Sequence, residues 1–290
     1  MNIELPLREN SGLFMAAQDD PAAARGVILG APLDDTGSFR TGSRFAPAAV
    51  RRVSRALEEY SITLDRTLEQ LPFADAGDLL LAPGDTQNSR RTIARATSTL
   101  VGAGKIPFLI GGEHTITLAA VEGCLEHRDS LTILYIDAHA DLRPSYMNLP
   151  LSHASVAYHL QHLPGVTLYE LGVRSADREE LSHIPGNHFF PFSLYEPLKQ
   201  ILPLLAGQPL YISLDMDVVD PAFAPGVSAP EPGGITSGEL LQIFPLLKPF
   251  WEQVVAFDLV EICPAYDDSA AITALLGAKI MREALLSFIR

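Results

Sequence analysis

Acidic and imidazole side chains alternate at the end of an apolar run near the middle of the sequence. The segment LTILYIDAHADLR (131–143) carries Asp137, His139 and Asp141 at every second position. Alternation along an extended backbone puts these three side chains on one side. Because bare carboxylates at the end of a buried strand would be costly, the pattern predicts that a cation lies between them.

Other apolar runs are also followed by polar residues. His114 follows FLIGG, and Glu261 lies late in VVAFDLVE. Asp215 and Asp217 close the segment LYISLDMD. In sheets of parallel strands, ligands bind beyond the carboxyl ends of the strands. We therefore expect four separate strands to deliver these side chains to one edge of a sheet.

The candidate metal ligands are histidines and aspartates without any thiolate: His114, Asp137, His139, Asp141, Asp215 and Asp217. Nitrogen and oxygen donors of this kind suit Mn²⁺ or a similar divalent ion better than a structural zinc. So many ligands exceed the need of one catalytic ion with an open position, but they suit two ions that share carboxylates. Two such ions and a bridging hydroxide would leave the cluster slightly negative, which favours a cationic substrate.

The composition argues against several classes of partner. The formal net charge of −14 over 290 residues predicts no nucleic-acid partner, because phosphate contacts need clusters of Lys and Arg. Two cysteines, Cys124 and Cys263, are too few for a disulfide framework and indicate a reducing compartment. The segment MNIELPLREN (1–10) does not resemble a signal peptide, and no apolar run is long enough to span a bilayer. We therefore expect a cytoplasmic protein without a membrane partner.

Short apolar runs alternate with helical patterns along most of the chain. We expect strands at 26–32, 106–112, 131–137, 166–174, 208–217 and 254–264. We expect helices at 45–60, 88–104, 114–127, 152–163, 237–250 and 269–289. This alternation predicts an α/β fold with a mostly parallel sheet covered on both faces. No linker interrupts the pattern, so we expect a single domain over residues 1–290.

Several segments together resemble the signatures of the ureohydrolase family, which includes arginases and agmatinases, and their detail is closer to agmatinases. The segments are APLDDTGSFRTGSRFAPAAVR (31–51), GGEHT (111–115), DAHADLR (137–143), SLDMDVVDPAFAPG (213–226), PEPGG (230–234), DLVEICPAYD (258–267) and ITALLGAKIMREAL (272–285). The resemblance covers nearly the whole chain. It implies a three-layer αβα fold and a two-manganese centre that cleaves a guanidino group to urea and an amine. With agmatine as the substrate, the amine would be putrescine. It also implies a homo-oligomer, either a trimer or a hexamer.

The resemblance further implies how the metal ligands are divided. One manganese would be bound by His114, Asp137, Asp141 and Asp215. The other would be bound by Asp137, His139, Asp215 and Asp217. Asp137 and Asp215 would therefore bridge the two ions, and a hydroxide between the ions would attack the guanidinium carbon of the substrate.

Catalytic roles are implied for three residues. Asp141 would help to hold the hydroxide and then pass a proton to the leaving amine. Glu261 would pair with the guanidinium, because a carboxylate gives it charge-assisted and directional bonds. His153, in LSHAS, would shuttle protons, although its position before a helical pattern, taken without the metal ligands, is more typical of a helix cap. Four charged residues of segment 31–51 are assigned no chemistry and are expected to form a loop lattice or subunit contacts: Asp34, Arg40, Arg44 and Arg51.

The sequence also departs from the family pattern. Glu113 and Thr115 stand where many relatives have Asp and Ser, and neither is an expected ligand, so the metal prediction is unchanged. Ala154 stands where many relatives have Gly, which could alter the substrate pocket. The segment between Asp141 and His153 is rather apolar. This favours agmatine, an amine without a carboxylate.

Other functions remain open at this point. A two-metal phosphoesterase would use DAH (137–139) and GNHF (186–189), but the order of the motifs differs from that class. A single-zinc deacetylase would need an adjacent His-His pair, which the sequence lacks. A ureohydrolase scaffold without activity is disfavoured, because every expected ligand is present. Within the family, the alternative substrates are aminopropylagmatine, guanidinobutyrate, formiminoglutamate and arginine.

Overall fold

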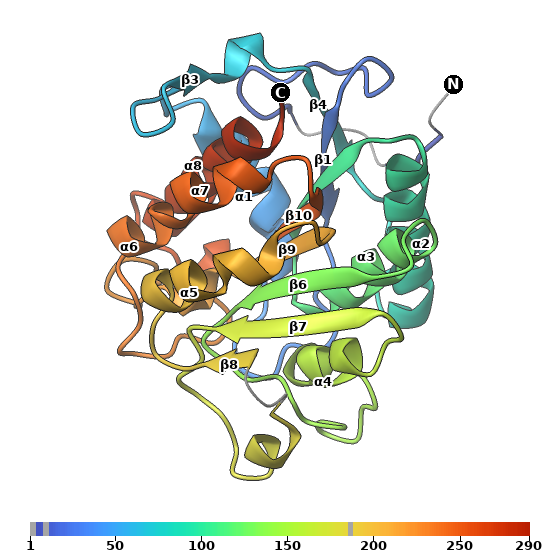
Figure 1. The fold of residues 1–290 in the computed structure, drawn as a ribbon, viewed down its shortest axis with the longest axis vertical. Coiled ribbons are helices and arrows are strands. Elements are labelled where there is room, and N and C mark those ends of the chain that lie inside the picture. The colour runs from blue at the N-terminus through green and yellow to red at the C-terminus, as the bar shows by residue number, and fades with distance from the viewer. Residues whose placement is uncertain (1–3, 8–11, 185–187) are drawn as a thin grey trace.

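The computed structural model describes residues 4–7, 12–184 and 188–290, and a large twisted sheet runs through its centre (Figure 1). All neighbouring strands of this sheet are parallel, in the order β4-β1-β5-β10-β9-β6-β7-β8. The strands are β1 (Gly26–Ala31), β4 (Phe73–Asp78), β5 (Ile106–Gly111), β6 (Leu131–Ile136), β7 (Val166–Leu171), β8 (Phe189–Phe190), β9 (Leu210–Asp215) and β10 (Val254–Val260). A separate antiparallel pair consists of β2 (Tyr60–Ser61) and β3 (Arg66–Thr67). Parts of two segments considered above, MNIELPLREN (1–10) and GNHF (186–189), lie outside the described residues.

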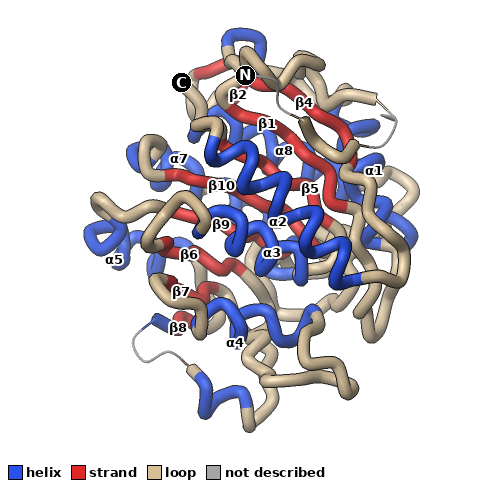
Figure 2. The backbone as a smooth tube through the Cα atoms, turned by 90° about the vertical axis from the view of Figure 1, so that its right-hand side faces the viewer, coloured by secondary structure: helices blue, strands red, loops and turns tan. Residues whose placement is uncertain are grey.

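Helices cover both faces of the sheet, which confirms the three-layer αβα architecture. One face carries α1 (Ala46–Ser54), α5 (Tyr195–Leu205), α6 (Ser237–Leu241), α7 (Ile243–Leu247) and α8 (Ile272–Phe288). The other face carries α2 (Thr86–Gly102), α3 (Thr115–Leu125) and α4 (Val156–Gln161). Figure 2 shows these three helices in front of the strands. Each helical layer packs its apolar side chains against the sheet in a core cluster of its own.

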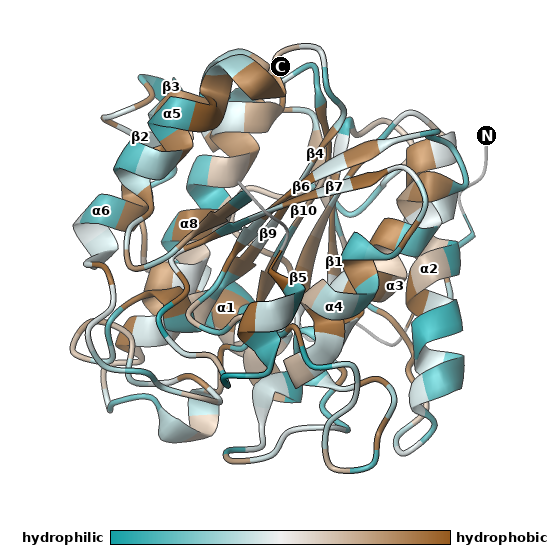
Figure 3. Cartoon of the chain, turned by 60° about the horizontal axis from the view of Figure 1, so that its bottom comes forward, coloured by the Kyte–Doolittle hydropathy of each residue, from teal (hydrophilic) through white to brown (hydrophobic). Residues whose placement is uncertain are grey.

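The central strands are buried along their whole length. Every residue of β1, β5, β6, β9 and β10 is buried, as a parallel sheet covered on both faces requires. Their sequences are therefore continuous apolar runs rather than alternating ones. Figure 3 shows the hydrophobic strands in the interior and hydrophilic residues on the outer turns of helices such as α2.

The order of the strands brings distant parts of the sequence together. β5, β10, β9 and β6 are consecutive in the sheet. Because they are parallel, their carboxyl ends meet at one edge. Asp137 directly follows β6, Asp215 is the last residue of β9, and Glu261 directly follows β10. His114 lies just beyond β5, immediately before α3.

All six expected strands are present, with ends shorter by a few residues. The expected helices differ more. The helix expected at 45–60 ends at Ser54, and the one expected at 152–163 begins as a 3-10 turn before α4. The helix expected at 237–250 is divided into α6, α7 and a 3-10 turn. Pro245 explains this division, because its ring excludes the helical position of the carbonyl of Leu241, where α6 ends.

Two larger elements escaped the sequence analysis. The strand β4 has the sequence FADAGD, whose acids and glycine are typical of a turn, yet it pairs along the edge of β1. The helix α5 contains Pro197 and Pro203, which normally mark helix boundaries. In both segments, tertiary packing outweighs local propensity.

One sheet takes its strands from β1 through to β10, so it spans most of the chain. This continuity supports the expectation of a single domain over residues 1–290, which stays a prediction. Among the described residues, no helix is both long enough and apolar enough to cross a membrane.

Some of the polar residues of segment 31–51 form the expected loop lattice. Asp34 accepts hydrogen bonds from the backbone N–H of Gly42 (2.6 Å) and from Arg44. Arg51, with a side chain only 2% exposed, binds the Asp75 carboxylate through Nε (2.7 Å) and Nη2 (2.9 Å) and also contacts Asp78. Burial acts to lower the pKa of Arg51, but the two aspartates outweigh it and raise that pKa. This ion-pair cluster connects α1 to the edge strand β4.

We expect Arg51→Met to lower the free energy of unfolding by about 3–5 kcal/mol, because it leaves the buried Asp75 charge without its cationic partner. Urea unfolding, followed by circular dichroism at a saturating metal concentration, measures this. Arg90→Met is the matched control, since the Arg90–Glu122 pair (2.9 Å) is partly exposed and such pairs contribute at most about 1 kcal/mol. Equal effects of the two substitutions would contradict the prediction.

Candidate metal centre and substrate pocket

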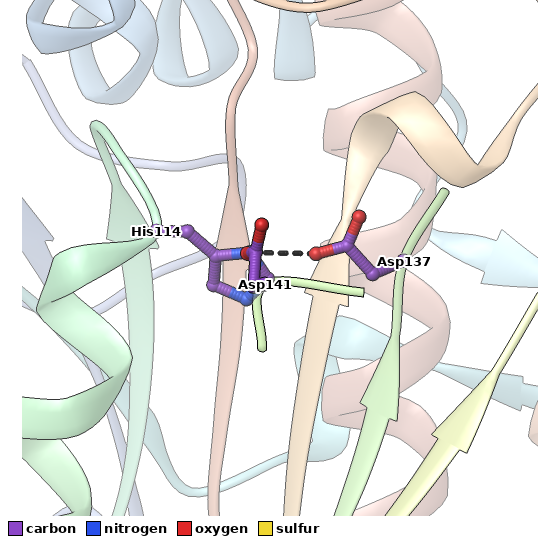
Figure 4. Close-up of side chains that lie close together, drawn as sticks. All are labelled: His114, Asp137 and Asp141. Carbon is purple, nitrogen blue, oxygen red and sulfur yellow. Dashed lines mark ion pairs between the residues drawn. The ribbon is translucent and has the colours of Figure 1, made fainter. Parts of the chain in front are cut away.

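The loop after β5 determines where His114 lies. Gly112 packs against the backbone of the loop that follows β1, and a Cβ at this glycine would lie 1.8 Å from the carbonyl oxygen of Leu33. Only glycine allows this approach. The chain then turns into α3, and the buried His114 points toward the ends of β6 and β9. Figure 4 shows its ring directed at the carboxylates of Asp137 and Asp141.

A first metal-binding group surrounds His114. Its Nδ1 lies 3.0 Å from Asp137 Oδ2, 3.1 Å from Asp215 Oδ2 and 3.7 Å from Asp141 Oδ2. The donor atoms of His114, Asp137 and Asp141 are close enough together to bind one metal ion. Asp215 contributes an oxygen from the adjacent strand end.

A second metal-binding group surrounds His139. Its Nδ1 lies 2.9 Å from Asp217 Oδ2 and 3.6 Å from Asp137 Oδ1, and these three residues also have the spacing of metal ligands. Asp137 therefore directs one oxygen to each group. Such a shared carboxylate is the usual link between two metal ions about 3.5–4 Å apart.

The charges of these residues fit divalent cations. Asp137, Asp215 and Asp217 are each at most 2% exposed. Among the described residues, Asp137 Oδ2 has no hydrogen-bond donor of good geometry, although His114 Nδ1 is near. Uncompensated carboxylates are costly in such an interior. The residues present thus fit a pair of bound cations.

Without a metal, the site draws its positive charge from protons. Burial acts to lower the pKa values of His114 and His139, but neighbouring aspartates outweigh it and raise both values well above the ordinary one. Burial, together with the charge of Asp217, raises the pKa of Asp215 well above its usual range. Burial and the Asp137 charge do the same to Asp141. Metal ions would take the place of these protons.

A buried hydrogen-bond network orients the imidazole of His114. Ser213 Oγ donates to Asp258 Oδ1 (2.8 Å), so it accepts from His114 Nε2 at 2.9 Å. Asp258 also accepts from Tyr211 (2.6 Å) and from Thr117 (2.8 Å). With the proton on Nε2, the Nδ1 lone pair of His114 faces the carboxylates. This is the tautomer that a metal ligand requires.

Asp141 and Glu261 hold unusual backbone conformations next to the metal-binding groups. Both are non-glycine residues with positive φ, 50° and 63°, and such strain is characteristic of functional sites. Tyr135 donates to Asp141 Oδ2 at 2.7 Å, and the backbone N–H of His114 donates to Glu261 Oε1 at 2.7 Å. Burial raises the pKa of Glu261 to about 8.

His153 faces the same cavity. The 3-10 turn that it begins is capped by Ser152, whose backbone N–H donates to Ser155 Oγ (2.8 Å), so the His153 side chain is not needed as a cap. Its ring instead contacts Thr36 Oγ1 (3.3 Å) and Ser38 Oγ (3.1 Å). Burial lowers the pKa of His153 below its ordinary value.

A cavity of about 350 Å³ opens above the metal-binding groups. Its wall includes His153 and Glu261, for which catalytic roles are expected from the sequence. It also includes Arg40 and Arg143, for which no role in the site is expected from the sequence. The segment after Asp141 was expected to offer few polar groups, and Arg143 is an exception. Nothing in the local sequence marks these two arginines, because only the loop packing turns them toward the cavity.

Asp177 also lines the cavity, near Arg143. Arg143 Nη1 lies 3.6 Å from Asp177 Oδ2, and its Nη2 lies 3.4 Å from Glu180 Oε2. The Asp177 side chain is 49% exposed and that of Glu180 only 5%. Glu180 already accepts from the backbone N–H groups of Leu142 and Asp177. Asp177 is therefore the more available of the two carboxylates.

Comparisons with known proteins agree with this geometry. The chain is 43% identical over 267 residues to an agmatinase of Bacillus anthracis, with 91% of this chain and 92% of that protein covered. It is 35% identical over 274 residues to N(1)-aminopropylagmatine ureohydrolase of Thermococcus kodakarensis, with 90% of each covered. The crystal structure of agmatine ureohydrolase of Thermoplasma volcanium matches with a TM-score of 0.85 and 30% identity, over 95% of this chain and 94% of that chain. The match to the Arginase family spans residues 24–287, and the chain belongs to this family.

Proposed function

We propose that this protein is a manganese-dependent agmatinase, which hydrolyses the guanidino group of agmatine to urea and putrescine. The observation that carries the proposal is the pair of metal-binding groups joined by Asp137, at the base of a cavity that contains Glu261. Relatives named agmatinase, such as the protein of Bacillus anthracis, support the choice of substrate. The expected ligand atoms are all nitrogen or oxygen, which supports manganese as the metal.

The metal ligands in this proposal are the six residues gathered at the sheet edge: His114, Asp137, His139, Asp141, Asp215 and Asp217. Two divalent ions, when bound there, supply an activated water as nucleophile and offset the charge of the carboxylates. The net reaction adds water across the bond between the guanidino carbon and the alkyl nitrogen. Urea leaves with the carbon, and the alkyl nitrogen leaves as the amine of putrescine.

Glu261 positions the substrate in this reaction. Its Oε1 is held by the backbone N–H of His114 (2.7 Å), and the carboxyl group lines the cavity. A carboxylate binds a guanidinium through charge-assisted hydrogen bonds. A guanidinium also favours the ionised form of Glu261, whose pKa is otherwise raised by burial.

Two further groups move protons. Asp141 takes the proton released by the water and delivers it to the alkyl nitrogen as the bond breaks. Tyr135 keeps the Asp141 carboxylate in place through the bond to Oδ2. His153 exchanges protons between this region and the outer part of the cavity, where it lies beside Ser38.

The lining of the cavity contains a group suited to the agmatine ammonium, Asp177. Asp177 is half exposed, lies 3.6 Å from Arg143 and accepts one backbone hydrogen bond, from Glu179 (3.2 Å), so its carboxylate can accept further hydrogen bonds from an ammonium group. The charge of the chain, formally −14, also favours a cationic substrate.

A second candidate substrate is a guanidino compound with a carboxylate tail, such as guanidinobutyrate. The specific observation in its favour is that both Arg40 and Arg143 line the cavity. Arg40 donates to the carbonyls of Pro225 (3.2 Å) and Val227 (3.4 Å), and no described carboxylate forms an ion pair with it. The phosphoesterase alternative has no such support. His188 of its GNHF motif packs on Tyr169, with ring centroids 4.4 Å apart.

We also propose a cytoplasmic homo-oligomer, a trimer or a hexamer. Cys124 and Cys263 are both free and buried, which supports a reducing compartment. The oligomeric state rests on the resemblance to ureohydrolases, and the mass of the purified protein in solution tests it.

Substrate preference is the first test. We expect the Mn²⁺-loaded protein to release urea from agmatine much faster than from guanidinobutyrate or arginine, because Asp177 can bind the ammonium tail. Urea measured in parallel with the three compounds gives the comparison. A preference for guanidinobutyrate would select the second candidate, and no urea from any compound would refute the proposed reaction.

Metal binding and activity should be lost together in Asp137→Asn, because this carboxylate joins the two metal-binding groups. Metal content per chain, determined by elemental analysis after gel filtration, and urea release from agmatine provide the two measurements. The matched control is Asp220→Asn, since Asp220 only bonds backbone N–H groups of its own loop region, including Gly233 and Gly234. Full metal content in Asp137→Asn would contradict the assignment.

Glu261→Gln should separate binding of metal from binding of substrate. We expect normal metal content and a fall in kcat/KM for agmatine of about 10²-fold or more, as for loss of a charged partner of a buried guanidinium. Metal analysis and steady-state kinetics on the same preparation test this. Wild-type kinetics in Glu261→Gln would refute the role proposed for this residue.

A further inference from the structure

Glu113 is a buried carboxylate that the proposed mechanism leaves unused. It is 1% exposed and lies next to His114, yet it points away from the metal-binding groups toward the loop after β1. Its Oε2 accepts from the backbone N–H groups of Asp35 (2.8 Å) and Thr36 (2.6 Å). Its Oε1 accepts from the hydroxyls of Thr36 (2.9 Å) and Thr115 (2.5 Å).

All of these partners can act as donors to Glu113. The two backbone N–H groups can only donate, so Oε2 must accept both. A carboxylate surrounded only by donors is best satisfied in its ionised form. The Thr36 hydroxyl then donates its hydrogen to Glu113.

The same hydroxyl of Thr36 contacts His153. Thr36 Oγ1 also lies 3.0 Å from the backbone nitrogen of His153 and 3.3 Å from its ring Nδ1. A hydroxyl has one hydrogen and two lone pairs. Because the hydrogen is given to Glu113, both contacts with His153 must be ones in which Thr36 accepts. Nδ1 of His153 therefore carries a proton.

The other ring nitrogen of His153 is left with its lone pair. Nε2 lies 3.1 Å from Ser38 Oγ, and both residues line the cavity. Since neutral imidazole carries only one proton, Ser38 donates to Nε2 while the ring is neutral. A solvent or substrate proton can then be accepted at Nε2, the position that faces the cavity.

We infer that Glu113, acting through the hydroxyl of Thr36, is a positioning residue that sets the tautomer of His153, with the proton on Nδ1 and an unprotonated Nε2 toward the cavity. The inference deepens the proposed function, because it assigns the atom of His153 that exchanges protons. The arrangement is a carboxylate–hydroxyl–imidazole chain, in which a threonine stands between the acid and the histidine. It also gives a reason for Glu113 and Thr115 at positions where they bind no metal.

The direct test locates the proton by neutron diffraction from crystals of the Mn²⁺-loaded protein. We expect density for hydrogen on Nδ1 of His153 and on Thr36 Oγ1 toward Glu113. In Glu113→Gln, the amide oxygen must take the Oε2 place to accept from the two backbone N–H groups. The amide NH₂ then donates to Thr36, whose hydrogen turns to Nδ1, and the proton of His153 moves to Nε2. An Nε2–H tautomer in the wild type, or an unchanged tautomer in Glu113→Gln, would overturn the inference.

Kinetics provide the second readout. Glu113→Gln and Thr36→Val should lower kcat for agmatine by about 10²-fold, within the range of a positioned acid or base, with KM and metal content unchanged. Thr36→Ser keeps the hydroxyl and should restore most of kcat. Thr115→Val is the matched control: it removes the other hydroxyl from the same oxygen of Glu113 and should leave the His153 tautomer in place. Equal losses in Thr36→Ser and Thr36→Val would indicate a merely structural role and contradict the inference.

The experiments test the tautomer of His153 separately from the proposed hydrolysis of agmatine. The neutron result does not depend on turnover, so the tautomer can be established even if no guanidino compound yields urea. Conversely, rapid urea release with an Nε2–H tautomer in the wild type would keep the proposed function and refute the role of Glu113.

Discussion

The structure depends on one electrostatic constraint, the gathering of buried carboxylates at the carboxyl edge of the sheet. Asp137, Asp215 and Asp217 lie almost fully out of solvent, and their nearest positive groups are the imidazoles of His114 and His139. Such an arrangement is stable only if cations offset the charge. The fold provides the rigid strand ends that keep these carboxylates together. Binding of divalent cations is therefore built into the architecture.

Buried carboxylates around the site fall into two kinds. Asp258 and Glu113 are surrounded by hydroxyl and N–H donors, so they need no cation and serve to orient histidines. Asp137 and Asp215, in contrast, have few donors and face the imidazole of His114. The donors in the first kind decide which nitrogen of a histidine carries a proton. The same residue type thus suits a bound cation in one environment and a fixed histidine tautomer in the other.

Two residues with strained backbone lie beside the cavity, Asp141 and Glu261. Glu261 directly follows β10, and Asp141 lies in the loop after β6, while the strands before them are regular and buried. A rigid sheet can hold these conformations, because the cost of a strained residue is small beside the packing of the two core clusters. The loops after β1 and β6 are held by hydrogen bonds, from Thr36 to Glu113 and from Tyr135 to Asp141. Loops without such bonds would position a guanidino carbon less well.

The sequence by itself determined the class of fold and the six expected strands, and it indicated a set of candidate metal ligands. These features follow short-range patterns: apolar runs define buried strands, and acidic residues and histidines follow directly after those runs. The tertiary structure alone decided the rest. Tertiary contacts stabilise β4 and α5 against their local propensities. They also direct the side chains of Arg40, Arg143 and Asp177 toward the cavity. The tertiary structure also linked Glu113 to His153 through Thr36, since such contacts join residues far apart in the chain and depend on loop packing that no local pattern encodes.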